Sequence, residues 1–424
     1  MVWVHYKMAV LYANARGALV MKSQRMSRIF EALDSFEIEL PSWGFADTGT
    51  RFGKFFQEAS ASTTEEKFHD AGLVHQLTGA CPTVAVHVRW DFKTGQHPRE
   101  VVRLAEKYGV GIGSINPNLF QDQCYKLGSF CSPDAAARRA AMTHTLDCVE
   151  IGRLVKSKYL TFWLGDGTNY PGQDNIVRRK RDLQRAFRRV AETMPSRMTM
   201  LIEYKPFEPA FYHTDIADWG MAYVFCKYAS SGMRGRRVKV LVDTGHHYQS
   251  VNIEHIVAFL LDEGMIGGFH FNDRKYADDD LTLGSIDPYA TFRIFNQIVQ
   301  HAFDTGKDPK LAYMIDQSHN LKPKIEAMVQ SVDLAQRLFV KAHLVDRKAL
   351  ARAQQKGDVV AAERLLQDAY ETDVRHVVRD WRASRKLPLD PLGELRSSGV
   401  INHLGRQRSA ARKARGEVQV ASYA

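Results

Sequence analysis

The sequence predicts an α/β protein with a (β/α)₈ barrel and a helical extension after it. Short apolar runs of β type alternate with longer helical patterns, which is typical of a parallel sheet built from βα units. Eight such runs can be counted, and no GxGxxG or GxxxxGKS turn occurs, so an open nucleotide-binding sheet is disfavoured. A closed barrel uses about 250 residues, which leaves part of this 424-residue chain for flanking segments.

We expect an N-terminal helical segment over 1–37, a barrel over 38–340 and a helical extension over 341–424. The eight predicted strands are rich in β-branched and aromatic residues, and they cover 38–45, 83–90, 109–118, 158–167, 198–205, 238–245, 267–273 and 312–319. Apolar residues at helical spacing predict helices over 134–156, 174–194, 320–340 and 346–384. After the break at 387–393 we expect a basic, flexible end, and we expect the extension to contact a neighbouring subunit.

The composition indicates a soluble globular protein, with 45% hydrophobic and 25% charged residues. No stretch has the roughly 20 apolar residues that a membrane span needs, and Lys7 interrupts an N-terminus that has no basic region before it. Five cysteines are scattered without a CxxC pair, which argues against a disulfide framework and a thiolate metal site. We therefore expect a cytoplasmic protein that has no membrane partner.

The net charge of +10 raises the question of a nucleic-acid partner. Residues 341–424 hold 17 Lys and Arg against 10 Asp and Glu, so most of the surplus lies in the extension. A solvated helical surface is the favoured interpretation, and no nucleic-acid partner is expected.

Polar residues gather where the last four predicted strands end, which is where barrels of this class carry their functional groups. Side chains alternate along a strand, so Phe269 and Phe271 should face the covering helices while His270 faces the barrel mouth. Carboxylate and imidazole ligands without thiolates suit Mn²⁺, Co²⁺ or Zn²⁺. One ion can be reached from four consecutive strands by Glu203, Asp243, His270 and Asp316.

A second group of metal-type ligands lies in the adjoining loops and consists of His246, Asp278 and Asp280, which suit a second ion in the same cleft. Each residue has an alternative explanation when taken alone. A strand-end Asp can cap a helix, His270 can be a hydrogen-bonded core residue, and Asp278 with Asp280 can belong to a solvated loop. Seven such groups at one barrel mouth favour the metal interpretation.

Aromatic residues near other strand ends suggest a sugar pocket, because hydrophobic ring faces pack on aromatic walls while hydroxyls meet polar groups. Trp43 and Trp163 are placed to form such walls, although a single Trp is often part of the core. His87 and Trp90 share one predicted strand, and alternation turns them to opposite faces unless the strand ends before Trp90.

Several longer motifs resemble the L-rhamnose isomerases of the broad-specificity bacterial type. They are SWG, WLGDGTNYPGQ, EYKPFEPAFY, VDTGHH, GGFHFNDRKYADDD and MIDQSHN, and the similarity runs roughly from Pro41 to Asp380. The resemblance implies a xylose-isomerase-like TIM barrel, a homotetramer, and two divalent ions per subunit, typically Mn²⁺ with Co²⁺, Zn²⁺ or Mg²⁺ as alternatives.

The resemblance also implies residue roles. A structural metal site matches Glu203, Asp243, His270 and Asp316, and a catalytic metal site matches His246, Asp278 and Asp280. The substrate-contacting positions match Trp43, His87, Trp163 and Lys205, with Trp90 beside them and Phe52 as an aromatic residue contributed by a neighbouring subunit.

The resemblance therefore implies a metal-dependent aldose–ketose isomerase that interconverts L-rhamnose and L-rhamnulose, with D-allose and D-psicose (D-allulose) as a further pair. We expect Asp280 to hold the catalytic ion, Lys205 to place positive charge near the developing oxyanion, and Asp316 to act as a carboxylate partner. We expect His87 to assist ring opening, because imidazole titrates near neutral pH.

Two other functions are compatible with the pattern. A barrel metallo-phosphodiesterase or endonuclease acting on DNA would share the scaffold and the ligand types, but its strand ends should carry phosphate-binding basic residues rather than acids and tryptophans. A non-catalytic sugar-binding protein would have no need of the complete ligand set and Lys205.

Overall fold

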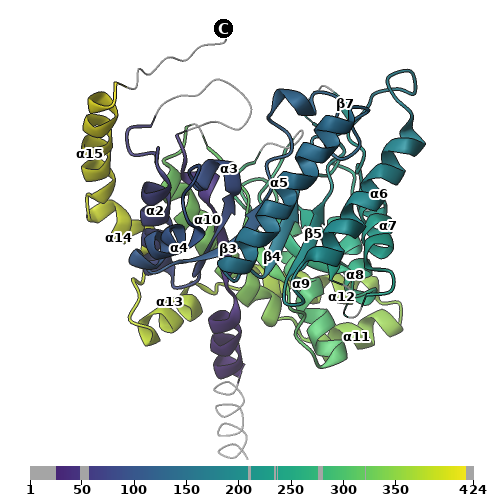
Figure 1. Cartoon of the computed structure of the whole chain (residues 1–424). Coiled ribbons are helices and arrows are strands. Elements are labelled where there is room, and N and C mark those ends of the chain that lie inside the picture. The colour runs from purple at the N-terminus through teal and green to yellow at the C-terminus, as the bar shows by residue number, and fades with distance from the viewer. Residues whose placement is uncertain are drawn as a thin grey trace, which may run out of the picture.

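Eight parallel strands close into a barrel in the computed structural model, which describes residues 25–47, 57–208, 212–233, 235, 237–275, 280–319 and 321–416 (Figure 1). Each predicted strand is present, and the order around the barrel is β1-β10-β9-β8-β5-β4-β3-β2. The bounds are β1 Ile38–Pro41, β2 Thr83–His87, β3 Gly111–Asn116, β4 Tyr159–Phe162, β5 Thr199–Glu203, β8 Val238–Asp243, β9 Ile266–Phe271 and β10 Ala312–Ile315. The sequence therefore predicts the (β/α)₈ barrel correctly.

The strands are shorter than predicted at the barrel mouth, because other local structures take over there. Ser42–Phe45 forms a 3-10 helix, η1, and Val88–Asp91 forms a one-turn helix, α3. A short antiparallel pair, β6 Phe207–Glu208 and β7 Tyr212–His213, stands beyond β5. A second 3-10 helix, η2, covers Gln123–Tyr125.

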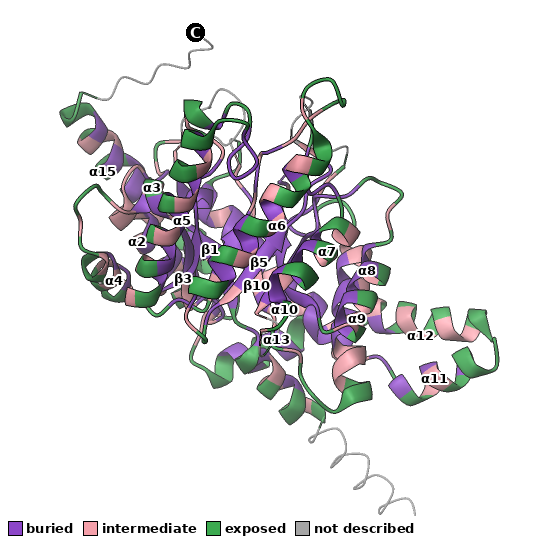
Figure 2. Ribbon diagram, turned by 45° about the vertical axis from the view of Figure 1, so that its right-hand side comes forward, coloured by how far each residue is buried: buried purple, intermediate pink, exposed green. Residues whose placement is uncertain are grey.

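Helices surround the barrel and expose only their outer faces, as Figure 2 shows. The predicted helices over 134–156, 174–194 and 320–340 appear as α5, α6 and α10. The bounds are α2 Thr64–Thr78, α4 Pro98–Lys107, α5 Ala135–Leu154, α6 Ile176–Thr193, α7 Trp219–Ser230, α8 Ile253–Asp262, α9 Pro288–Thr305 and α10 Lys324–His343. Residues 25–35 of the expected N-terminal segment are helical, and 1–24 lie outside the described residues.

The main core lies between the strands and the helices. Phe269 and Phe271 are buried there with their rings stacked 4.9 Å apart, and Phe271 packs 5.2 Å from the ring of Phe295 in α9. This confirms that the two phenylalanines on β9 face outward from the barrel axis, so that His270 between them faces inward.

An acidic residue is buried on the inner face of the strands. Oε2 of Glu39 accepts a hydrogen bond from the backbone N–H of Ser114 at 2.8 Å, and burial raises the pKa of this carboxyl. A Cβ added to Gly113 would lie 1.4 Å from the same oxygen. The absence of a side chain at Gly113 is therefore what makes room for Glu39.

The C-terminal extension differs from two expectations. The predicted helix over 346–384 is three helices. Gly357, with φ +67°, separates the first from the second, and the extended backbone at Thr372 ends the second. The end expected to be flexible continues as two further helices through Ala414. The bounds are α11 Arg347–Gln355, α12 Val359–Glu371, α13 Arg375–Ser384, α14 Pro391–Ser397 and α15 Val400–Ala414.

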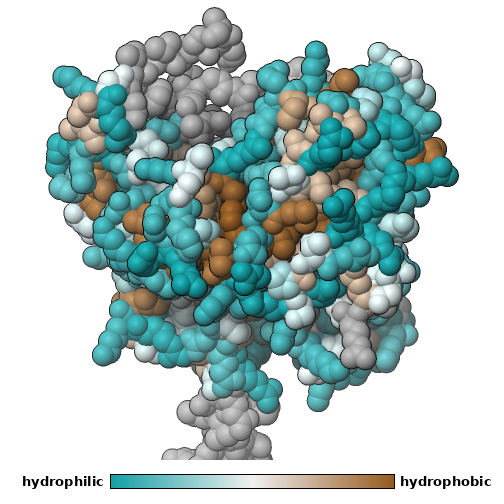
Figure 3. Space-filling view, in the orientation of Figure 1, coloured by the Kyte–Doolittle hydropathy of each residue, from teal (hydrophilic) through white to brown (hydrophobic). Residues whose placement is uncertain are grey.

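The basic residues of the extension were expected to lie on a solvated surface, but part of them is buried. Four of its arginines are buried, namely Arg347, Arg382, Arg408 and Arg412. Figures 1 and 2 place α15 at the edge of the barrel beside α2, while α11 and α12 project as a hairpin. The face shown in Figure 3 is mostly hydrophilic with separate apolar patches. Within the described ranges, no helix has the length and hydropathy of a membrane span.

Candidate active site

A cavity of about 560 Å³ opens at the C-terminal ends of the barrel strands. Its floor carries acidic and imidazole side chains from β5 and β9, from the loops after β8 and β9 and from the residue after β10, and its walls are largely aromatic. The lining comprises Trp43, Ala46, Asp47, Ala61, Ser62, Lys67, His87, Trp90, Asn116, Phe120, Gln121, Trp163, Glu203, Lys205, His246, His270, Asp280 and Asp316. The structure thus brings most of the predicted site residues into one cavity.

Four of the predicted ligands converge at the cavity floor. The register of β8 and β9 sets Asp243 beside His270, and Glu203 and Asp316 follow from the ends of the flanking strands. One ligand atom from each of the four lies within 4.8 Å of the others. Nδ1 of His270 lies 3.2 Å from Oε2 of Glu203 and 3.6 Å from Oδ2 of Asp316.

This cluster has the electrostatics of a cation site. Burial by itself lowers the pKa of His270, but the negative charge of Glu203 and its neighbouring carboxylates outweighs burial and raises that pKa to about 10. In the same way, burial of Glu203 is outweighed by His270, and the pKa of Glu203 lies below its usual value. Nδ1 of His270 is buried and has no well-aligned hydrogen-bond partner among the described residues. A divalent cation fits both features, since it supplies positive charge and an acceptor for this lone pair.

Neighbouring groups fix the orientation of the carboxylates. Oδ1 of Asp243 accepts hydrogen bonds from the backbone N–H of Gly245 at 2.7 Å and from Nδ2 of Asn272 at 3.1 Å. Nε1 of Trp43 donates to Oδ1 of Asp316 at 2.8 Å. Such supporting contacts hold metal ligands in place and tune their affinity.

The second predicted ligand group is only partly described. Nδ1 of His246 lies 3.0 Å from the carbonyl oxygen of Tyr204, and because a carbonyl only accepts, Nδ1 carries the hydrogen and Nε2 is left as an acceptor. Asp280 is buried, lines the cavity and adopts φ +48°, a left-handed conformation that is costly for a side chain other than Asn, Asp or Gly. Asp278 and Phe52 lie outside the described residues.

The aromatic wall forms around His87. Because β2 ends at His87 and α3 begins immediately, Trp90 turns back to the same side, and its ring lies 4.1 Å from that of His87. Trp43 lies 4.9 Å away on another side. Burial, together with the positive charge of Lys67, lowers the pKa of His87 to about 3. The near-neutral titration that the sequence predicts for His87 is therefore wrong for this cavity, and its imidazole is neutral at pH 7.

Lys205 and Trp163 form one side of the cavity together. Lys205 is buried, and its Nζ lies 4.9 Å from the centre of the Trp163 ring, within the range of a cation–π interaction. The pairing keeps an ammonium group close to the acidic floor while an aromatic surface faces the cavity.

Sequence reasoning missed the network below His87. Asp91 is buried, and its carboxylate accepts hydrogen bonds from Oγ of Ser42 at 2.6 Å, Nζ of Lys67 at 2.7 Å and the backbone N–H of His87 at 3.0 Å. It thereby joins η1, α2 and the end of β2. Asn116 at the end of β3 and Phe120 shortly after it also line the cavity. Their position at the end of a predicted strand could have identified them as site residues.

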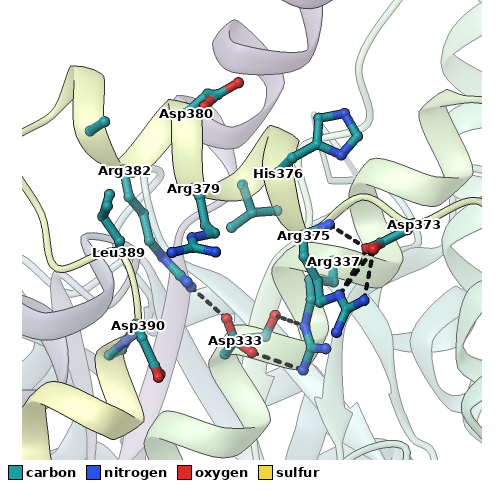
Figure 4. Close-up of a pocket in the computed structure, with 13 residues that line it drawn as sticks. Asp333, Arg337, Asp373, Arg375, His376, Arg379, Asp380, Arg382, Leu389 and Asp390 are labelled. Carbon is teal, nitrogen blue, oxygen red and sulfur yellow. Dashed lines mark hydrogen bonds and ion pairs between the residues drawn. The ribbon is translucent and has the colours of Figure 1, made fainter.

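Two other polar clusters contain arginines that pair with their carboxylates. A cavity of about 730 Å³ lies between α10 and the extension. In it, as Figure 4 shows, Asp333 pairs with Arg382 at 2.8 Å and Asp373 pairs with Arg375 at 2.8 Å. A Cys131–Asp166–Asp215 cluster has ligand-like spacing, but Arg179 donates to Asp215 at 2.8 Å.

Comparison with known proteins supports the relationship that the fold suggests. Residues 81–310 match the model of the xylose isomerase-like TIM barrel family. The chain belongs to this family. It is 38% identical over 404 residues to a probable sugar isomerase of Mesorhizobium japonicum, covering 94% of this chain and 92% of that protein. It is also 38% identical over 386 residues to a probable sugar isomerase of Rhizobium meliloti, covering 89% and 87%.

Among solved structures, an L-ribulose 3-epimerase superposes with a TM-score of 0.50 at 12% identity, covering 76% of this chain and 97% of that one. At this identity the superposition shows that the two proteins share the barrel fold.

Proposed function

We propose that this family member is a metal-dependent aldose–ketose isomerase whose substrates include L-rhamnose. The observation that carries the proposal is the convergence of Glu203, Asp243, His270 and Asp316 on the floor of an aromatic-walled cavity. The two relatives at 38% identity bear the name probable sugar isomerase, which supports the reaction class. The choice of L-rhamnose, with D-allose as a further aldose, rests on the sequence resemblance.

Two divalent ions, with Mn²⁺ as the first candidate, would account for the ligand groups. The four converging residues would hold one ion, and His246, Asp278 and Asp280 would hold the other. When bound, such an ion supplies Lewis acidity toward the sugar oxygens at C1 and C2.

The chain's own residues would bind and orient the open-chain sugar. Trp43, Trp90 and Trp163 present ring faces on which the carbon skeleton can pack, and the buried ammonium of Lys205 can stabilise negative charge that develops on a sugar oxygen. Asp316 is held by Trp43, so its carboxylate keeps one orientation while hydrogen moves between C1 and C2.

His87 would assist ring opening as a neutral hydrogen-bonding group. Burial and the positive charge of Lys67 lower its pKa to about 3, so the imidazole is unprotonated at neutral pH and is a weak base. It lines the cavity beside Trp43 and Trp90, where a neutral imidazole can hydrogen-bond to the anomeric hydroxyl of a cyclic sugar.

The cavity is less suited to DNA. Four carboxylates line it against two lysines, Lys67 and Lys205, and Lys67 is already paired with Asp91. Two bound divalent ions would offset those carboxylates, but a polyanionic backbone also needs basic residues around the cavity, and the described lining offers only these two lysines. The lining therefore favours a neutral, hydroxyl-bearing substrate over a phosphodiester.

The test is to deplete the protein of metal, titrate it with Mn²⁺, and measure ketose formation from L-rhamnose, D-allose and other aldoses. We expect activity to return with Mn²⁺ and to be lost in Asp280→Asn, which keeps the shape of the side chain but removes its charge. Asp262→Asn, on the exposed end of α8, is the matched control. Full activity of Asp280→Asn would refute the metal assignment, and inactivity with every sugar combined with cleavage of abasic DNA would favour the phosphodiesterase alternative.

We also propose that the protein is a homotetramer in which the extension contacts a neighbouring subunit. The projecting α11–α12 hairpin supports this, because Val359 and Val360 are 72% and 77% exposed at its tip. Light scattering coupled to size exclusion should report four chains, and a monomer would contradict the proposal.

A further inference from the structure

The last described helix, α15, carries a row of arginines on the face that meets the barrel. Arg408, Arg412 and Arg415 follow one another at spacings of four and three, so they lie on one side of the helix. All three donate hydrogen bonds to residues between 57 and 70. Arg408 and Arg412 are buried against the segment that leads into α2, whereas Arg415, the residue that follows the end of α15, is exposed.

Arg408 anchors the helix to α2. Its side chain is only 3% exposed, and its two terminal nitrogens donate to the two carboxylate oxygens of Asp70 at 2.8 and 2.7 Å. It also donates to the carbonyl oxygen of Ala59. A bidentate pair of this kind is among the stronger and more directional polar contacts in proteins.

Arg412 holds the backbone just before α2. It is buried, donates to the carbonyl oxygen of Ser60 at 3.0 Å and to that of Glu58, and lies 3.9 Å from Oδ2 of Asp47. Arg415 adds a hydrogen bond to Oγ of Ser62 at 2.9 Å. Three consecutive residues, 58–60, thus direct carbonyl oxygens at the arginines of α15.

The segment held by α15 is also a wall of the candidate active site. Asp47, Ala61 and Ser62 line the cavity. The backbone N–H of Ala61 donates to the carbonyl oxygen of Phe45 in η1 at 2.9 Å, and the N–H of Asp47 donates to the carbonyl oxygen of Ala61 at 2.8 Å. Trp43 belongs to the same 3-10 helix. A displacement of residues 58–62 would therefore move the cavity wall next to Trp43.

Burying two arginines is a costly way to attach a helix, because the desolvation of each guanidinium must be offset by well-placed acceptors. An apolar seam would attach α15 without that cost. The carbonyl oxygens of residues 58–60 belong to no helix or strand, and the arginines supply hydrogen-bond donors that fix their position.

We propose that α15 is a positioning element of the active site, in which Arg412 and Arg408 hold residues 58–62 so that Asp47, Ala61 and Ser62 form the sugar-binding wall. This rests on the proposed sugar-isomerase function. The arginines act on substrate binding through that wall, and they take no part in holding the metal ions or in moving the hydrogen.

The experiment uses the full-length, Mn²⁺-loaded protein and compares Arg412→Ala with Lys413→Ala, a neighbour on the exposed side of α15 that loses the same charge. We expect Arg412→Ala to raise KM for the best aldose about tenfold, while kcat changes less than about twofold. The displaced wall would lose contacts that bind the sugar equally well in the ground state and the transition state, and such a loss weakens binding without slowing the chemical step. Affinity for Mn²⁺ should be unchanged. Arg412→Lys, which keeps the charge but can donate to fewer carbonyls in fixed geometry, should give an intermediate KM.

Hydrogen exchange of the sugar-free protein gives a second readout that does not depend on activity. In Arg412→Ala the amides of residues 45–47 and 58–62 should exchange at least about tenfold faster, while those of β8 and β9 stay protected. Unchanged exchange in the wall, or an equal fall of kcat and Mn²⁺ affinity, would overturn the proposal. If the parent protein isomerises no aldose, the proposed function fails, and the exchange result alone decides whether α15 holds the wall.

Discussion

Replacing Trp43 by Phe would test whether the indole N–H supports the proposed metal site. Trp43 is 8% exposed, and its Nε1 donates to Oδ1 of Asp316 at 2.8 Å while the other carboxylate oxygen faces His270. Phenylalanine keeps an aromatic ring beside His87 but removes this donor. A hydrogen bond to a charged group contributes about 1.5–3 kcal/mol, and each 1.4 kcal/mol is a factor of ten. We therefore expect Mn²⁺ affinity to fall by roughly 10- to 100-fold. Removal of a group that supports a metal ligand typically lowers metal affinity by this amount.

The assay is calorimetric titration of the metal-depleted protein with Mn²⁺ and competition with a chelator of known affinity. Trp90→Phe is the matched control, because it removes the same group from the same cavity wall. Nε1 of Trp90 donates instead to the neutral amide oxygen of Gln121 at 2.8 Å. We expect its metal affinity to stay within about twofold. Equal losses in the two variants would refute the reasoning, since the loss would then come from the wall and not from the hydrogen bond to Asp316.

Three further predictions concern stability. Gly113→Ala should lower the free energy of unfolding by at least about 3 kcal/mol, because its Cβ would lie 1.4 Å from Glu39, and urea denaturation measures this. Burial lowers the folded pKa of His343 to about 4, below the unfolded value of 6.5, so the unfolded chain binds more protons and stability falls as pH drops from about 6.5 toward 4. His343→Met should flatten this fall in thermal melts, and an unchanged slope would contradict the assignment. Arg179→Met should cost about 3–5 kcal/mol, because it removes a buried guanidinium that pairs with the 10% exposed carboxylate of Asp215. Arg185→Met should cost less than about 1 kcal/mol, because the side chain of Arg185 is 64% exposed.

The barrel and the floor of the site could be predicted because both depend on local periodicity. Alternation along each strand decides which side chains face the mouth, and the parallel order of the strands then brings their C-terminal ends together. Asp243 and His270 lie opposite each other in the register of β8 and β9 for this reason. The strand ends were placed too late because SWG and VRW are as apolar as the strands before them, yet they turn into η1 and α3 at the rim.

Other features left no local signal. The pair of Arg408 with Asp70 joins residues 338 positions apart, and nothing in either sequence neighbourhood identifies its partner. By composition alone, the basic segment after residue 393 could not be distinguished from a solvated, flexible arm. The titration of His87 could not be foreseen either, because it depends on how completely the cavity removes the imidazole from water.

The attachment of α15 also has a consequence for how the protein is made. The contact between Arg408 and Ala59 spans 349 residues, so the ribosome synthesises the whole barrel before this donor exists. A nascent chain that has already closed its eight strands still lacks the group that holds residues 58–60. Contacts of such long sequence separation form late because loop closure must precede them. The cavity wall formed by residues 58–62 should accordingly be among the last parts of the molecule to mature, after Glu203, Asp243, His270 and Asp316 have come together.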